Sequence, residues 1–343
     1  MADSKGRTAL DLSVEVEANE EIRMLLERDT KPLPEAKAIA ILRWAVEEGA
    51  DVLVDRLLDQ HVDGESGTPN YGQRTLERAM ECSYHDARIT LDILLRKEVN
   101  FSRETRQKAF LLAAKIATPS TLREMGAKVA DVNGAVGDQT ALFAAVEEIE
   151  KVNEGNRENI EALLKMGADP NLQINDTTAL ALAEASDNWD AMSVLIDEGA
   201  DTKESDSDSL LLRCLLKFEK DYYGRDMWFH DKCTCQKYID EGCRNVSNCG
   251  RIRAVKDHRL KLSNVLAKLV KKIGNEINKV DSDGRTALHL AVDMRQWKLV
   301  TRLVRKGADM GMKDGKGQTP RDIADATGNL QAYHHAVERG LAA

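Results

Sequence analysis

A pattern of about 33 residues recurs along this chain of 343 residues and limits its fold more than any other feature. The segments NDTTALALAEASDNWDAMSVLIDEGADT (175–202) and DGRTALHLAVDMRQWKLVTRLVRKGADM (283–310) share one order: T-A-L, an apolar run, a polar break, a second apolar run and G-A-D. The same frame lies at 137–171, a shortened copy at 5–29 and a last copy at 315–337. Such a period is typical of a solenoid, in which each repeat buries its apolar face against the next.

Within one repeat, the residue pattern predicts two antiparallel helices and a turn. Thr286 can cap the first helix through its hydroxyl. Gly307 supplies the left-handed residue that ends the second helix, and Asp309 begins the turn toward the next repeat. Only 4% of the chain is aromatic, so the core must consist of aliphatic side chains. The apolar stripe of the second helix consists of Leu299, Val300, Leu303 and Val304.

These motifs resemble the ankyrin repeat, whose signature is T-P-L-H-x-A followed by two antiparallel helices and a hairpin-like loop. The matching segments are TALHLA (286–291), TALFAA (140–145), TALALA (178–183) and TALDLS (8–13), and Thr319-Pro320 keeps the family proline. The resemblance implies an all-α solenoid whose concave surface, made of hairpin tips and first helices, binds other proteins. It also implies that His289 is a structural capping residue.

The repeats vary along the chain. Residues 31–133 lack the T-x-L-H signature but keep three legible helical pairs, which we interpret as degenerate repeats. With them, about nine helix-turn-helix repeats form one predicted domain over 1–343. The seventh repeat is predicted to have helices at 209–217 and 257–274, separated by a long insertion over 218–258. Because Gly199 and Gly274 stand 75 residues apart, this repeat exceeds one period by 42 residues.

The insertion concentrates two rare residue types. Four of the six cysteines of the chain lie in it, at Cys233, Cys235, Cys243 and Cys249. One structural zinc, with His230 as a possible substitute ligand, would hold together a segment that has no core of its own. Free thiols in a helical hairpin, or disulfides if the protein is extracellular, are the alternatives. The predicted partner-binding residues are Tyr222, Tyr223, Arg225, Trp228 and Phe229, unless these aromatic side chains form the core of the insertion.

Charge is divided unevenly along the chain. Residues 1–210 carry 23 basic and 42 acidic side chains, whereas residues 211–343 carry 26 and 16. The basic part raises an alternative function, nucleic-acid binding through the zinc-stapled, aromatic and basic region 218–272. The lysines after residue 257, however, fall opposite Leu262, Val265 and Leu266, as on any amphipathic surface helix. This pattern favours a protein-binding or simply solvated basic face.

The sequence contains no motif that marks an enzyme. A phosphate-binding loop, an H-E-x-x-H zinc motif and a nucleophile elbow are all missing from it. It contains no apolar run of the length of a membrane helix, and it opens on an acidic segment unlike a secretory signal. We therefore expect a non-catalytic interaction scaffold inside the cell, cytoplasmic or nuclear. Its partner should be another protein, and it should act as a monomer or as part of a larger assembly.

Overall fold

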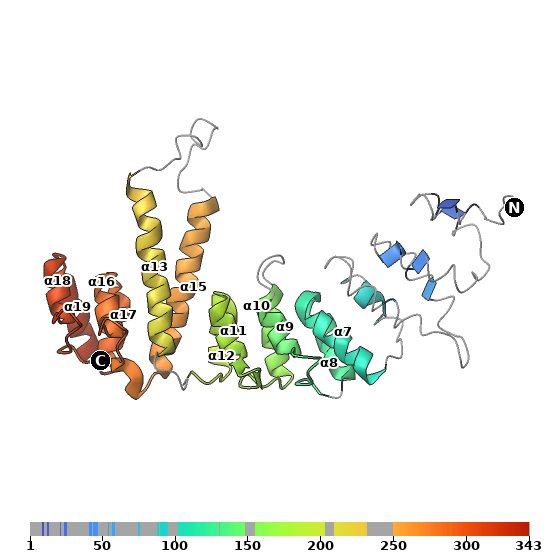
Figure 1. The fold of residues 1–343 in the computed structure, drawn as a ribbon, viewed down its shortest axis with the longest axis horizontal. Coiled ribbons are helices and arrows are strands. Elements are labelled where there is room, and N and C mark those ends of the chain that lie inside the picture. The colour runs from blue at the N-terminus through green and yellow to red at the C-terminus, as the bar shows by residue number, and fades with distance from the viewer. Residues whose placement is uncertain are drawn as a thin grey trace. The chain divides into compact units, whose positions relative to one another are not determined.

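Helices make up nearly all the regular structure in the computed structural model of this chain (Figure 1). The structure describes residues 102–129, 131–147, 155–202, 209–231 and 250–342, together with single positions between 9 and 94. Two compact units divide the chain, Met1–Asp176 and Thr177–Ala343. No helix in these described ranges is both long and apolar enough to cross a membrane.

The first unit contains two described helix pairs. Helix α7 (Arg103–Ile116) is followed by α8 (Pro119–Lys128), and α9 (Ala141–Glu147) by α10 (Gly155–Lys165). Helix α7 packs against α8 and α9, and α10 packs against all three other helices. Because two residues join α7 to α8, the two helices must run antiparallel. Ile41, Leu58 and Leu91, which lie in the predicted degenerate repeats, are helical and buried.

A buried asparagine joins these two helix pairs. Asn159 of α10 donates its amide hydrogens to the carbonyl oxygens of Ala114 and Ala117, at 3.3 and 2.9 Å. These carbonyls lie at the end of α7, where the helix has no partners of its own for them. The side chain of one repeat therefore caps a helix of the repeat before it.

The described residues of the second unit form four helix pairs. They are α11 (Ala179–Ala185) with α12 (Trp189–Asp197), α13 (Leu210–Asp231) with α15 (Gly250–Lys272), α16 (Ala287–Asp293) with α17 (Trp297–Arg305), and α18 (Pro320–Ala326) with α19 (Leu330–Leu341). Neighbouring pairs pack on each other, α12 against α15, α13 against α16, α15 against α17 and α17 against α19. A short 3₁₀ helix, η2 (Asn275–Asn278), follows α15.

Threonines begin the first helices, as the sequence predicts. Thr178, Thr286 and Thr319 each accept a hydrogen bond from the backbone three residues ahead. At Thr319 the cap is reciprocal, because Asp322 accepts hydrogen bonds from the Thr319 backbone and hydroxyl at 2.8 and 2.7 Å. The backbone hydrogen bond, followed by the hydroxyl, lowers the pKa of Asp322. This cap is therefore complete above the usual pKa of aspartate and is lost as the pH falls through the lowered value.

The turns between repeats are tied in the same way in each unit. The side-chain oxygen of Asn133 accepts from the backbone nitrogen of Asp169 at 2.8 Å, and that of Asn278 accepts from Asp309 at 2.9 Å. Both aspartates then accept a backbone hydrogen bond from the residue two positions on. The strands β1 (Gln173–Ile174) and β2 (Thr177–Thr178) form a short hairpin in which the division between the units falls.

Two glycines allow consecutive turns of the second unit to touch. The backbone nitrogen of Gly315 donates to the Asp283 carbonyl oxygen at 2.8 Å. A Cβ atom on Gly284 would lie 2.9 Å from the Gly315 nitrogen, and one on Gly315 would lie 2.7 Å from the Asp283 oxygen. Any other residue would force these turns apart.

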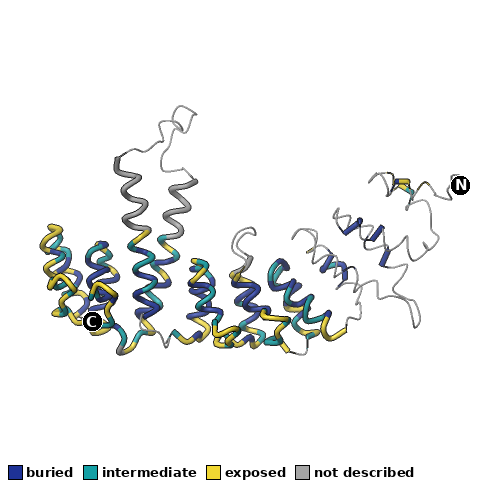
Figure 2. Tube along the Cα trace, in the orientation of Figure 1, coloured by how far each residue is buried: buried dark blue, intermediate teal, exposed yellow. Residues whose placement is uncertain are grey.

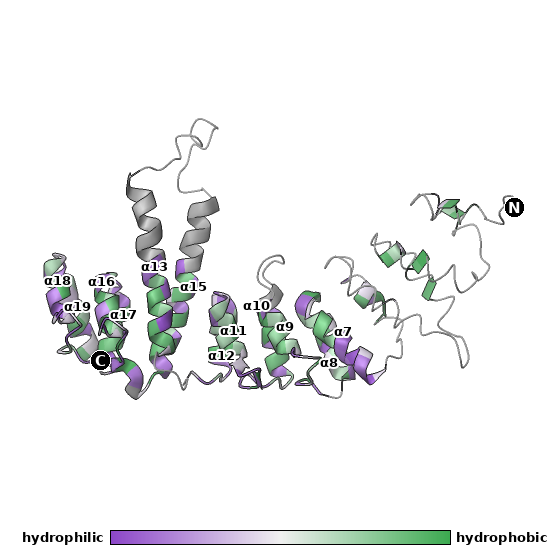
Figure 3. Ribbon diagram, viewed as in Figure 1, coloured by the Kyte–Doolittle hydropathy of each residue, from purple (hydrophilic) through white to green (hydrophobic). Residues whose placement is uncertain are grey.

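The core follows the apolar stripes of the helices. Figure 2 shows buried residues along the sides where paired helices face each other, and Figure 3 shows hydrophobic residues at the same places. The second helix α17 confirms the predicted stripe, because Leu299, Val300, Leu303 and Val304 are all buried. Gly307 has the predicted positive φ of 88°.

Two predicted boundaries were wrong, both in the seventh repeat. Helix α13 runs to Asp231 rather than 217, and α15 begins at Gly250 rather than 257. The predicted insertion over 218–258 therefore begins and ends inside helices. Gly274 does not end α15 in a left-handed conformation; its φ is −103° and it precedes η2. Most of the shortened copy at 5–29 and of the degenerate repeats before residue 102 lies outside the described residues, so the count of nine repeats stays a prediction.

His289 links two repeats, which confirms its predicted structural role. Its Nδ1 accepts from the Thr286 backbone nitrogen at 3.1 Å and lies 2.8 Å from the Thr286 hydroxyl oxygen. Its Nε2 lies 3.1 Å from the carbonyl oxygen of Gln318, so the ring proton must sit on Nε2. The side chain is fully buried. One imidazole thus completes the cap of α16 and holds the turn that precedes α18.

Replacing His289 with Leu is expected to lower the free energy of unfolding of the second unit by about 1–3 kcal/mol. Leucine keeps most of the volume but leaves the Gln318 carbonyl and the Thr286 amide without this partner. Urea denaturation measures the change. His334→Leu is the matched control, since His334 is exposed and its loss should change stability by less than about 0.5 kcal/mol. Equal effects of the two substitutions would contradict the bridging role.

Candidate protein-interaction surface

The pair α13–α15 is much longer than its neighbours in the second unit. Helix α13 has 22 residues and α15 has 23, whereas α16 has 7 and α17 has 9. At about 1.5 Å per residue, the long helices extend roughly 20 Å beyond the helices of the next repeat. Figure 1 shows the two helices side by side and projecting past α16 and α17. We call the part beyond Lys220 and before Leu260 the projecting hairpin.

The base of this hairpin is an ordinary repeat core. Helices α13 and α15 pack against each other. Their buried side chains are Leu211, Leu215 and Phe218 on α13 and Leu262, Leu266 and Leu269 on α15. The burial of Leu262, Val265, Leu266 and Leu269 confirms the predicted apolar face of α15. The base therefore folds as part of the solenoid, and only the upper half leaves it.

A partly buried charge network joins the base of the hairpin to the following turn. The Arg285 guanidinium lies 2.7 Å from the Glu219 carboxylate and 3.0 Å from that of Asp281. Asp281 also accepts backbone hydrogen bonds from Asp283 and Arg285, at 2.9 and 2.8 Å. Burial by itself would lower the pKa of Arg285, but the hydrogen bond and charge of Glu219, together with Asp281, raise it overall. Arg285 therefore fixes α13 where the hairpin begins to project.

Further ion pairs hold both long helices to the preceding repeat. Arg213 of α13 makes a two-pronged contact with the Glu184 carboxylate, with distances of 2.7–3.2 Å. Lys217 lies 2.9 Å from Asp187, and its ammonium stands 5.6 Å from the centre of the Trp189 ring. Helix α13 is thus anchored on both sides at its base.

Several lysines of the basic region 218–272 form contacts within the fold. Lys261 pairs with Asp190 at 2.7 Å, and Lys268 pairs with Asp197. Lys272 donates to the carbonyl oxygen of Ile196. All three reach from α15 to α12. Because the charges of Lys261 and Lys268 are compensated there, these two lysines do not favour the nucleic-acid alternative for region 218–272.

The predicted partner-binding residues share one helix. Tyr222, Tyr223, Arg225, Trp228 and Phe229 all lie in the backbone of α13, within the projecting hairpin, as does His230. The structure describes the backbone there but not the side chains. Cys233, Cys235, Cys243 and Cys249 lie outside the described residues, and the described Cys214 is buried. Within the described residues, no group of three or more His, Cys, Asp or Glu is arranged to hold a metal.

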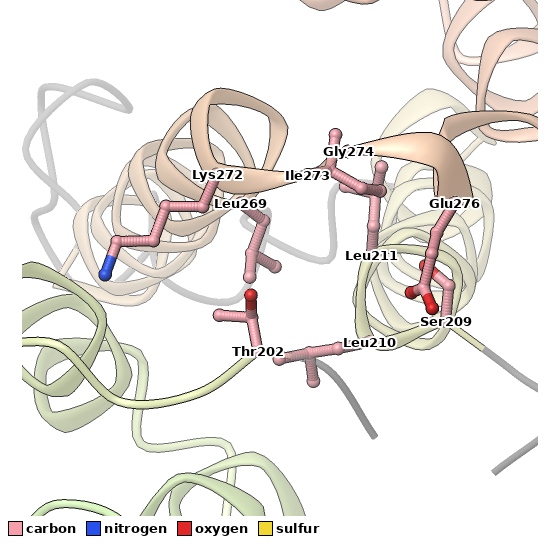
Figure 4. Close-up of a pocket in the computed structure, with 9 residues that line it drawn as sticks. All are labelled: Thr202, Ser209, Leu210, Leu211, Leu269, Lys272, Ile273, Gly274 and Glu276. Carbon is pink, nitrogen blue, oxygen red and sulfur yellow. The ribbon is translucent and has the colours of Figure 1, made fainter. Parts of the chain in front are cut away.

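A cavity of 420 Å³ lies where α13 begins and α15 ends. Figure 4 shows the side chain of Leu269 pointing toward Thr202, with the Glu276 carboxylate directed toward Ser209 and the Lys272 ammonium pointing away from both. Lys272 donates to Ile196, and Glu276 pairs with Lys279 at 3.2 Å. The charged groups of this cavity therefore already have partners.

Sequence reasoning missed the contact between Glu219 and Arg285. The two residues are 66 positions apart and belong to different repeats. No local pattern pairs them, although the sequence does show that Arg285 directly follows the turn-forming residues D-S-D-G. It also missed a groove between α15 and α17 whose lining includes Lys271, Arg302 and Arg305. The sequence signal for this groove is the recurrence of basic residues late in both helices.

The comparisons with known proteins support the repeat assignment. The family model "Ankyrin repeat" matches residues 137–175 and 283–315. The putative ankyrin repeat protein L271 of Acanthamoeba polyphaga mimivirus is 38% identical over 66 residues, which is 19% of this chain and 9% of that protein. Human transient receptor potential cation channel subfamily A member 1 is 42% identical over 53 residues, 16% of this chain and 5% of that protein. These matches span less than a tenth of the length of either relative.

Two solved structures are also similar. The crystal structure of EF0377, an ankyrin repeat protein, has 18% identity and a TM-score of 0.40, covering 71% of this chain and 98% of that one. One chain from the structure of the Bd0816 predatory endopeptidase from Bdellovibrio bacteriovorus in complex with immunity protein Bd3460 has 23% identity and a TM-score of 0.36, covering 67% of this chain and 97% of that one.

The family match agrees with the local geometry at the same residues. Each matched segment contains a threonine-capped first helix, a second helix that ends at a positive-φ glycine, and an aspartate turn. One matched segment lies in each unit. Ankyrin repeats generally mediate protein–protein interaction, and proteins built from them are typically non-catalytic. The chain therefore contains ankyrin repeats in both of its units.

Proposed function

We propose that this chain is a non-catalytic recognition module that binds another protein, and that the projecting hairpin provides the specific contact. The length of α13 and α15 is the observation that carries the proposal. A solenoid repeat needs no more than the seven to nine residues that α16 and α17 use to pack. The additional turns of α13 and α15 extend beyond the helices of the next repeat, so they do not serve that packing. Helices that extend beyond the core present side chains to a partner.

The residues on the projecting hairpin support this role. Tyr, Trp and Arg dominate the energetically important positions of protein interfaces. Tyr222, Arg225 and Trp228 lie within about two turns of α13. In contrast, the first helix α16 carries small and aliphatic residues that are buried in the stack. The concave surface of the repeats is the competing site.

A deletion separates the two sites. Residues 222–257 are removed and a short Gly-Ser linker joins α13 to α15, which keeps Glu219 and the buried base. Linkers of a few residues commonly connect antiparallel helices, so the second unit should remain folded. We expect the deletion protein to unfold cooperatively as before but to lose the partners that full-length protein retains in affinity purification from cell lysate. Retention of the same partners would place the site on the concave surface.

A point variant provides a matched control for this experiment. Tyr222→Ala with Trp228→Ala should reduce partner recovery while helix content, measured by circular dichroism, stays the same. Lys313→Ala with Lys316→Ala, both exposed in a turn of the same unit, should leave recovery unchanged. If the aromatic variant instead loses helix content while binding persists, the aromatic residues form the core of the hairpin and are not the contact.

We also propose that one zinc ion staples the tip of the hairpin. Cys233 follows the end of α13 by two residues, and Cys249 directly precedes α15. Together with Cys235 and Cys243, these thiolates would supply the four ligands of a tetrahedral zinc site. We expect about one zinc per full-length chain and none in the deletion protein, measured by plasma emission spectrometry. Equal zinc contents of the two proteins would refute the staple without affecting the proposed contact.

A further inference from the structure

A groove of 380 Å³ runs between α15 and α17 in the second unit. Its apolar base includes Val270, which is buried, and Ala267, which is half-buried. The remaining lining residues are all cationic: Lys268, Lys271, Arg302, Arg305 and Lys306. Such a combination of an apolar base and a rim of one charge is not required by helix packing.

Comparison with the preceding junction shows how unusual this rim is. Lys272 of α15 donates to the Ile196 carbonyl at the end of α12. In the next repeat, Lys306 donates to the Lys271 carbonyl near the end of α15, at 2.8 Å. Lys306 therefore stands to α15 as Lys272 stands to α12, which aligns the two junctions residue by residue. On this alignment Arg302 of α17 corresponds to Lys268 of α15. Lys272 of α15 corresponds to Asp197 of α12.

The substitution of a lysine for an aspartate leaves the second groove uncompensated. At the first junction, Asp197 pairs with Lys268 and Asp190 pairs with Lys261. At the second junction, no carboxylate of the described residues pairs with Lys271, Arg302, Arg305 or Lys306. Lys306 and Arg305 do donate to carbonyl oxygens of Lys271 and Arg339. A helix end carries only about half a unit of negative charge, so these contacts leave most of the positive charge unbalanced.

We propose that this cationic groove binds an acidic segment of a partner protein and takes one of its apolar side chains into the base. Carboxylates would pair with Arg302, Arg305 and Lys271 at the rim, where arginine can bind a carboxylate in two-pronged geometry. The groove volume suits one large side chain. The lining contains no aromatic residue on which a nucleic-acid base could stack. The proposal concerns a different surface from the projecting hairpin and does not depend on it.

The test uses full-length protein and fluorescently labelled synthetic peptides. The probe is a short Asp/Glu peptide with a central Leu-Phe, and fluorescence anisotropy measures its dissociation constant at low salt. We expect replacing Leu-Phe by Ser-Ser to weaken binding severalfold, and replacing the acidic residues by Asn and Gln to abolish it. Ala267→Trp, which fills the base of the groove, should weaken the Leu-Phe peptide but leave the Ser-Ser peptide nearly unchanged.

Charge reversals locate the site. Lys271→Glu with Arg302→Glu should weaken the probe at least about tenfold, because two rim cations become repulsive. The matched control is Lys298→Glu with Lys316→Glu, which reverses two exposed cations outside the groove and should change affinity less than about twofold. Thermal unfolding verifies that both proteins are folded.

Three results would overturn the proposal. In the first, both charge-reversal proteins bind the probe equally weakly, which shows that the peptide responds to the overall positive charge and not to the groove. In the second, Ala267→Trp does not weaken binding of the Leu-Phe peptide, and the Ser-Ser peptide binds as tightly as the Leu-Phe peptide. The apolar base then takes no part in binding. In the third, a DNA duplex or single strand binds more tightly than the peptide and loses affinity in the Lys271/Arg302 protein alone, which assigns the groove to nucleic acid.

Discussion

Leu303→Ala is expected to lower the free energy of unfolding of the second unit by about 2–5 kcal/mol. The Leu303 side chain is fully buried in α17, where this helix packs against α15, α16 and α19. Truncation removes three heavy atoms from the core and leaves a cavity that three neighbouring helices must close. Guanidinium denaturation followed by circular dichroism measures the loss.

Leu163→Ala in α10 should cost a similar amount in the first unit, because Leu163 is equally buried and α10 contacts α7, α8 and α9. In a solenoid, a local core defect weakens its own repeat and the neighbouring contacts most. Native-state hydrogen exchange should therefore show faster exchange in Met1–Asp176 for Leu163→Ala and in Thr177–Ala343 for Leu303→Ala.

Leu260→Ala provides the control for both truncations. Leu260 is 60% exposed on α15, so the same chemical change should alter stability by less than about 0.5 kcal/mol. A neutral result at Leu303 would mean that the apolar stripe of α17 does not face the core. Identical exchange patterns for Leu163→Ala and Leu303→Ala would mean instead that the two units unfold as one.

The repeats could be predicted from the sequence because the residues that determine them lie close together in the chain. The Thr286 cap, the burial of Leu303 and the left-handed Gly307 each follow from residues within one repeat, and each is confirmed. His289 was predicted from the family signature, and the structure shows its physical basis in the contact with Gln318.

The candidate surfaces depend on relations that a single sequence does not reveal. The predicted end of α13 near 217 assumed helices of standard repeat length, but the charged and aromatic residues after Phe218 continue the helix to Asp231. Gly274 resembles the glycines that end other second helices, yet a 3₁₀ helix follows it instead of an aspartate turn. The cationic groove arises only when α17 is set beside α15, because each helix alone is an ordinary amphipathic helix.

Arg285→Met should be the most informative polar substitution, with an expected loss of about 2–3 kcal/mol in the free energy of unfolding. Removing the guanidinium leaves the carboxylates of Glu219 and Asp281 facing each other without a cation. Fully buried pairs typically cost about 3–5 kcal/mol when one partner is removed. The Arg285 side chain is 23% exposed, so water offsets part of this cost.

A double-mutant cycle isolates the contact that holds the hairpin. Glu219→Gln should cost less than Arg285→Met, because glutamine still accepts a hydrogen bond and Asp281 still pairs with the arginine. The double variant should be more stable than the sum of the single effects predicts, by about 0.5–3 kcal/mol, which is the usual range for contacting charges. Arg321→Met, at an exposed arginine of the same unit, should be close to neutral. Additive single effects would show that Glu219 and Arg285 do not interact.

The same cycle connects stability with the proposed recognition. Glu219 lies on α13 just before the projecting hairpin, and Arg285 precedes α16 in the next repeat. This ion pair therefore sets the direction in which α13 leaves the solenoid. Loss of the pair should speed hydrogen exchange at the base of α13 and weaken partner binding, although neither residue lies on the proposed contact. Unchanged partner affinity with faster exchange would show that the partner does not require a fixed hairpin direction.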